Sequence, residues 1–124
     1  MAIFDVDNIR IALGLLFSVA GLAHFTHHDF FDRLVPESLA SHAIPINIAT
    51  GTLQIIGGIT MCIPGWRKVA RWANLTLLVP TMLPAINQVL YPETVEKVGL
   101  SPQLALVRVF LQFGIIATVW RTTR

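Results

Sequence analysis

The sequence predicts an all-α integral membrane protein, a four-helix bundle whose N- and C-termini are both cytoplasmic. Of its 124 residues, 54% are hydrophobic and only 13% are charged. Soluble domains carry about 25% charged residues, and a domain of this size cannot bury so much apolar area. The hydrophobic residues also fall into four long runs with almost no charge. We therefore expect residues 1–124 to form a single transmembrane domain.

The four apolar runs lie at about 9–25, 45–63, 69–90 and 104–120. Each approaches the ~20 residues that a helix needs to cross about 30 Å of hydrocarbon. A bilayer requires backbone groups to be hydrogen-bonded within their own segment, and the runs lack strand-like alternation, so we expect helices. Pro80 and Pro84 remove backbone hydrogen bonds from the third run and should kink it.

The orientation follows from the distribution of basic residues. Asp5 and Asp7 precede the first run, which lacks a signal-peptide pattern, so we expect it to stay as a membrane anchor. With four spans, both ends and the second loop share one side. That side has six basic residues and the other has two, which places the ends in the cytoplasm. The six are Arg10, Arg67, Lys68, Arg71, Arg121 and Arg124; the two are Arg33 and Lys97.

The first outer loop, residues 26–44, is longer than a turn requires. Phe30, Phe31 and Leu34 alternate with Asp29 and Asp32 at roughly helical spacing. This pattern is typical of a short amphipathic helix on the outer membrane interface. A loop packed over the mouth of the bundle explains it equally well, so both alternatives stay open.

Polar residues inside the spans predict a pocket. Such residues are costly in lipid and usually face the bundle interior, and their depths follow from 1.5 Å of rise per residue. Small residues at helical spacing, Gly51 and Gly58 beside Asn47 and Gln54, permit close helix approach. We expect a ligand-binding pocket that opens outward and is closed toward the cytoplasm. Its predicted residues are Arg108, Asn87, His24 and Asn47 in an outer layer, with Gln54 and Gln112 nearer the midplane.

Arg108 is the most informative of these residues, because none of the spans contains an acidic residue to neutralise it. Its guanidinium offers a planar fork of donors to an anionic or carbonyl-bearing ligand. Alternatively, it extends to the interface or cross-links helices. His24 likewise is either a ligand contact or a structural hydrogen-bonding group.

Several functions have no support in the sequence. The basic residues form no stripe with aromatics, so no nucleic-acid partner is predicted. The histidines of the first loop match no zinc spacing, and no metal site is predicted. Catalytic motifs and paired carboxylates inside the spans are missing, so catalytic residues are unknown and enzymatic activity stays open.

Five segments resemble the DoxX-like family of small four-helix bacterial membrane proteins. They are the stretches 10–25 and 30–36, Thr50-Gly51 through Gly57, Pro84-Ala-Ile-Asn87, and Arg108 through Gln112. The resemblance covers nearly the whole chain. Many family members have glutamate in place of Gln54, which puts proton-coupled quinone chemistry by this chain alone in doubt.

The resemblance implies a multi-pass protein of the bacterial inner membrane with its long first loop on the periplasmic side. It suggests a non-catalytic subunit, or a binder of a lipid-like or quinone-like small molecule, in a redox-associated system. The alternatives are an oxidoreductase component acting on quinone and a purely structural subunit. Partners would be the bilayer, redox-system subunits or a second copy. No cofactor is predicted, although quinone stays open.

Overall fold

The computed structural model describes residues 5–35 and 37–124, and every regular element in these residues is a helix. Four segments are long and apolar enough to span a membrane: Val6–Thr26, Ser38–Cys62, Arg67–Leu90 and Pro102–Thr122. The predicted all-α class and the four helical segments of membrane-spanning length are therefore confirmed, although each begins earlier than predicted, the second one by several residues. The elements are α1 (Val6–Thr26), α2 (His28–Leu34), the 3₁₀ helix η2 (Glu37–His42), α3 (Ala43–Cys62), α4 (Arg67–Leu78), α5 (Met82–Leu90), α6 (Glu93–Glu96) and α7 (Pro102–Thr122).

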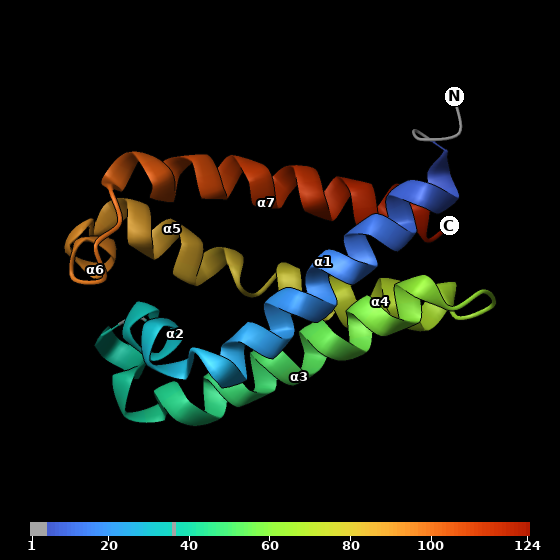
Figure 1. The fold of residues 1–124 in the computed structure, drawn as a ribbon. Helices are drawn as coiled ribbons and strands as arrows, with labels where there is room; N and C mark the ends of the chain where they lie inside the picture. Colours follow the sequence, from blue (N-terminus) through green and yellow to red (C-terminus); the bar gives the residue numbers. More distant parts are fainter. Residues whose placement is uncertain (1–4, 36) are drawn as a thin grey trace.

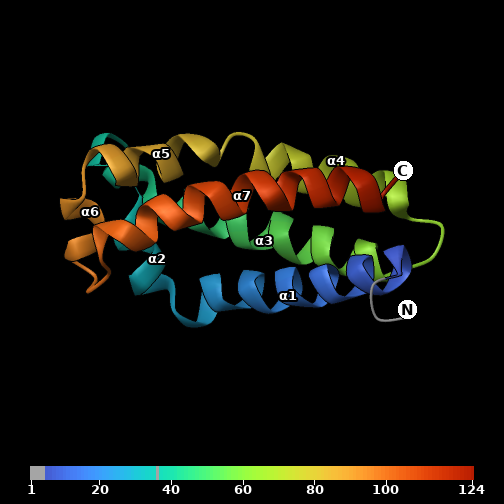
Figure 2. The same ribbon diagram turned by 90° about the horizontal axis from the view of Figure 1, so that it is seen from above.

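The long helices form two pairs that separate at one end of the bundle. Helix α1 lies along α3, and α5 lies along α7, while α4 contacts both α3 and α7 and so joins the pairs (Figure 1). The start of α1, the turn between α3 and α4, and the end of α7 all lie at the joined end (Figure 2). Helices α2 and α6 lie at the opposite, separated end. This arrangement leaves room for a cavity between the pairs.

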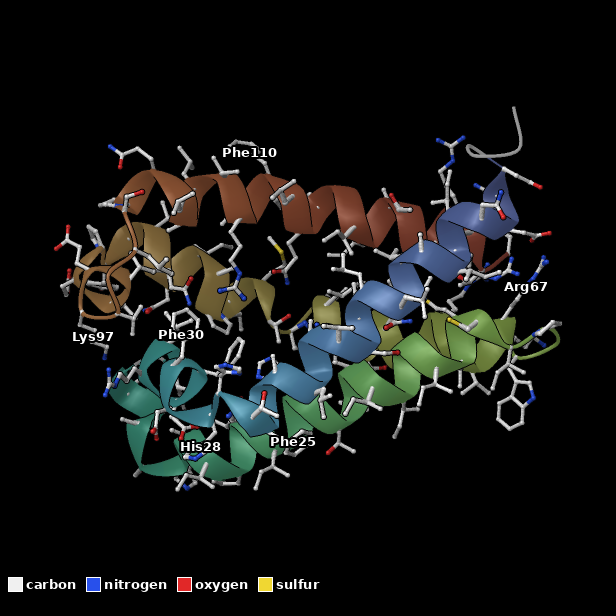
Figure 3. All side chains as sticks on the ribbon, viewed as in Figure 1. Phe25, His28, Phe30, Arg67, Lys97 and Phe110 are labelled. Carbon is white, nitrogen blue, oxygen red and sulfur yellow. The ribbon has the colours of Figure 1, made fainter. Side chains whose placement is uncertain are left out.

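The outer surface of the bundle is strongly apolar. Leu83 is 73% exposed, and Val19 and Phe110 are each 68% exposed; Figure 3 shows Phe110 pointing away from the bundle. Large contiguous apolar surfaces are rare on soluble monomers. On four helices of membrane-spanning length, such a surface is the one expected to contact lipid.

Helices α1 and α3 pack through their glycines. A Cβ atom added to Gly14 would lie 2.6 Å from the carbonyl oxygen of Gly58, and one added to Gly21 would lie 2.8 Å from that of Gly51. Both distances are shorter than any real carbon–oxygen contact, so only glycine permits this helix approach. In membranes, where water does not drive helices together, such close van der Waals packing is a main source of association. The predicted role of small residues is confirmed here.

The third span is interrupted near its middle, where α4 ends at Leu78 and α5 begins at Met82. Pro80 has no amide proton to continue the helical hydrogen bonds. The hydroxyl of Thr81 donates to the carbonyl oxygens of Leu77 at 2.8 Å and Leu78 at 3.2 Å. The predicted kink is thus a break in the helix, and polar side chains satisfy part of the exposed backbone.

Charged residues cluster at the joined end of the bundle, which Arg67 marks in Figure 3. Arg10 is only 4% exposed and donates through Nε to the carbonyl oxygen of Met61 at 3.0 Å. Its Nη1 lies 2.7 Å from Asp7 Oδ1, which also accepts from Arg67 at 3.2 Å. These bonds join the start of α1 to the turn between α3 and α4.

Candidate ligand-binding cavity

A cavity of about 500 Å³ lies between the two helix pairs, toward the end that contains α2 and α6. This volume falls within the ~300–1,000 Å³ usual for small-molecule sites. Toward the joined end it is closed by the buried apolar cluster of Phe17, Met61, Ala70, Leu78 and Val119. The cavity therefore ends at this cluster, toward the end of the bundle where both termini lie (Figure 1).

Helix α2 covers part of this cavity. Phe30, Phe31 and Leu34 line it, and Phe30 points into the space between α2 and the α5–α6 region (Figure 3). The ring of Phe31 also stacks on His24, with ring centroids 3.9 Å apart. The segment between the first two spans thus contains a short helix, as the first sequence-based alternative expected, and this helix packs over the cavity, as the second expected.

Five of the six predicted pocket residues line the cavity. They come from three helices: His24 from α1, Asn47 and Gln54 from α3, and Arg108 and Gln112 from α7. The sixth, Asn87, is not among the described residues that line it. Its neighbour Gln88 takes that place and is 3% exposed. Gln88 follows Thr81 and Pro84 at helical spacing, and this register could have identified it from the sequence.

Arg108 extends from α7 across to α5. Its Nη1 donates to Gln88 Oε1 at 2.9 Å, and Gln88 Nε2 in turn donates weakly to the carbonyl oxygen of Leu34 at 3.5 Å. The guanidinium therefore lies in the cavity wall and cross-links two spans, as one sequence-based alternative proposed. Within the described part of the chain, no carboxylate lies within 4.0 Å of it.

His24 and Asn47 hold α1 against α3 by two reciprocal hydrogen bonds. Asn47 Nδ2 donates to the backbone carbonyl oxygen of His24 at 3.0 Å, which leaves Asn47 Oδ1 to accept from His24 Nδ1 at 2.5 Å. In a neutral ring this arrangement makes Nε2 the acceptor. Asn47 is 5% exposed, so the pair has a structural role whatever the cavity contains.

Gln112 and Gln54 occupy the deeper part of the cavity and differ in how their amides are satisfied. Gln112 Nε2 donates to the carbonyl oxygen of Leu78 at 2.8 Å and to Thr81 Oγ1 at 2.9 Å. It therefore attaches α7 to the break in the third span. Gln54 Oε1, in contrast, is buried with no hydrogen bond recorded at bonding distance, and its side chain lies beside the His24 ring.

Two further features lie beside the cavity. A groove between α1 and α7, lined by residues that include Leu13 and Gly114, shares Leu111 and Ile115 with the cavity wall. In α2, His28, Asp29 and Asp32 each place one potential ligand atom within 4.8 Å of the others. The ion pairs from His28 to Asp29 at 3.2 Å and to Asp32 at 3.5 Å account for this clustering.

Comparison with known proteins assigns the chain to a family. Residues 13–123 match the model of a domain of unknown function, DUF8561, so the chain belongs to this family. The matched region includes every residue that we place in the cavity wall. No curated protein and no solved structure matches the chain.

Proposed function

We propose that this member of the DUF8561 family binds a lipid-like or quinone-like amphiphile in the cavity between its helix pairs. The observation that carries the proposal is the guanidinium of Arg108 in the wall of a largely apolar cavity, with a neutral amide as its recorded hydrogen-bond partner. A polar head at Arg108 and Gln88 would lie near α2. An apolar tail would extend toward Phe17 and Leu78.

The surroundings of the cavity support a ligand from the bilayer. Leu111 and Ile115 line both the cavity and the groove between α1 and α7, so the cavity lies directly beside a surface that we expect to contact lipid. The resemblance to DoxX-like proteins supports a non-catalytic subunit in a redox-associated system of the bacterial inner membrane. Among the described residues, the polar ones that line the wall include no carboxylate for proton exchange, which favours binding over catalysis.

The experiment that tests the proposal fills the cavity. Thr50 lines it, whereas Thr52 lies on the exposed side of the same helix, and each hydroxyl donates to the carbonyl oxygen four residues earlier. We expect Thr50→Phe to lower the amount of co-purifying amphiphile at least about 10-fold, equivalent to ~1.4 kcal/mol. Native mass spectrometry and solvent extraction measure this amount.

Thr52→Phe is the matched control and should retain the wild-type amount. Tryptophan fluorescence checks that both variants are folded. If the two folded variants retain equal amounts of amphiphile, the ligand lies on the outer surface and the proposed cavity site is wrong. If wild-type protein retains none and binds no added ubiquinone analogue or fatty acid, the proposed function is wrong altogether.

The proposed orientation places the joined end, which has most of the basic residues, in the cytoplasm. In a Cys62→Ala background, we expect a membrane-impermeant maleimide to label Lys97→Cys in intact spheroplasts. Arg124→Cys should react only after permeabilisation. Both positions are exposed and lie at opposite ends of the bundle. The reverse labelling pattern would show that the orientation is inverted.

A further inference from the structure

We infer that the ligand of this cavity is an anionic amphiphile whose head forms an ion pair with Arg108. This inference rests on the proposed function and specifies the chemical class of the head. It depends on three properties of the cavity: its charge, its donors and acceptors, and its apolar walls.

The charge of the cavity wall is unbalanced. Arg108 is the one charged residue among the described residues that line the cavity, and none of them is an aspartate or a glutamate. The acidic residues with recorded ion pairs, Asp7, Asp29 and Asp32, belong to other clusters. Arg108 is an exposed residue that lines this cavity, so its charge is accessible to a bound molecule, and a charge within a membrane is costly when it has no counter-ion. A negative head beside Arg108 removes this imbalance, whereas a neutral head does not.

The hydrogen-bonding groups of Arg108 also favour a ligand with an anionic head. A guanidinium has five N–H donors in a planar fork that matches a carboxylate or phosphate in a bidentate arrangement. Within the described residues, one of these donors is recorded in a bond, to Gln88 Oε1. Charge-assisted bonds of this kind are roughly twice as strong as bonds between neutral groups. A quinone carbonyl accepts hydrogen bonds but leaves the positive charge unpaired.

The remaining walls require the anion to have an apolar tail. Phe17 and Leu78 close one end of the cavity, and Leu111 and Ile115 form the side next to the lipid-facing groove. A small hydrophilic anion would leave these surfaces without a partner. A hydrocarbon chain attached to the anionic group would pack against these surfaces. The shared chemistry, a single anionic group on a hydrocarbon chain, describes a free fatty acid or a single-chain phospholipid.

The experiment compares probes that differ in charge but share a chain. Native mass spectrometry of the detergent-purified full chain measures binding of dodecanoate, dodecanol, dodecyl phosphate and acetate. For wild type, we expect dodecanoate to bind at least about 10-fold more tightly than dodecanol, because only the carboxylate forms charge-assisted hydrogen bonds with the guanidinium. Acetate should not bind measurably, and the relative affinity of dodecyl phosphate distinguishes a phospholipid-type head from a carboxylate.

Variants of Arg108 test whether its charge causes the preference for dodecanoate over dodecanol. We expect Arg108→Gln to bind dodecanoate and dodecanol within about 2-fold of each other, and Arg108→Lys to keep part of the preference because it keeps the charge. Arg121→Gln, which removes an exposed positive charge at the end of α7, should bind like wild type. Thr50→Phe should lose binding of all three twelve-carbon probes: dodecanoate, dodecanol and dodecyl phosphate.

Three results would overturn the inference. The first is equal binding of dodecanoate and dodecanol by wild type, and the second is an undiminished preference in Arg108→Gln. The third is tighter binding of a ubiquinone analogue than of dodecanoate. Each leaves the proposed function intact if Thr50→Phe still blocks the neutral probe. The absence of any probe that Thr50→Phe displaces would instead remove the proposed function itself. If Arg108→Gln fails to fold, the Arg108→Lys and wild-type comparisons still decide the matter.

Discussion

Replacing Gly14 by leucine should separate α1 from α3 and prevent stable folding. The new side chain would begin 2.6 Å from the carbonyl oxygen of Gly58 and 2.9 Å from Met61 Cβ. Overpacking within a core usually costs about 1–3 kcal/mol. Here the clashing atom belongs to the backbone and cannot rotate aside, so the free energy of unfolding should fall by at least about 3 kcal/mol. Titration with SDS in mixed micelles, followed by tryptophan fluorescence, measures the free energy of unfolding.

Gly114→Leu is the matched control. An added Cβ at Gly114 in α7 meets no atom within 4 Å, so the free energy of unfolding should change by less than about 0.5 kcal/mol, as for most surface substitutions. Equal destabilisation by the two variants would mean that the glycine contacts between α1 and α3 do not determine the packing of this pair.

Replacing Gln112 by methionine should detach α7 from the break in the third span. Methionine has a similar length but cannot donate to the Leu78 carbonyl oxygen or to Thr81 Oγ1, the two bonds that Gln112 makes while only 6% exposed. An unsatisfied buried group costs about 1–3 kcal/mol. We therefore expect the free energy of unfolding to fall by this amount, measured by the same titration.

The control for Gln112→Met is Gln103→Met, at an exposed position near the start of α7. It should leave the free energy of unfolding nearly unchanged. Amide hydrogen exchange adds a local measurement. In Gln112→Met, the amides of residues 79–83 should exchange faster, because the interrupted segment loses its support. Unchanged exchange of these amides would show that the hydrogen bonds of Thr81 alone stabilise the interrupted segment.

Most of the fold could be predicted because lipid simplifies the problem. Four apolar runs of sufficient length imply four helices, since a bilayer does not hydrate free backbone groups. The glycine contacts between α1 and α3 were predictable too, because Gly14, Gly21, Gly51 and Gly58 recur on one face of each helix. The break at Pro80 was predictable in position. The hydrogen bond from Gln112 to the Leu78 carbonyl oxygen at this break was not predictable, because it joins residues 34 positions apart in the sequence.

The candidate site was predictable in composition but less so in pairing. Depth and helix face brought His24, Asn47, Gln54, Arg108 and Gln112 to one cavity. Asn87 was placed there on depth and on its resemblance to a family motif. The residues of the third span that line the cavity, Leu77, Thr81, Pro84 and Gln88, follow continuous helical spacing. Asn87 lies one residue off that face, so Gln88 contacts Arg108 instead. The contribution of α2 depended on how the outer loop folds back, which local sequence does not determine.

The position of Arg108 relative to a bound molecule is the central claim, and an experimental density map of the protein in lipid nanodiscs tests it most directly. We expect elongated density in the cavity between the helix pairs, with its head within hydrogen-bonding distance of the Arg108 guanidinium and its tail toward Phe17. A map in which aliphatic side chains fill this space, with the guanidinium among the lipid headgroups, would contradict the account.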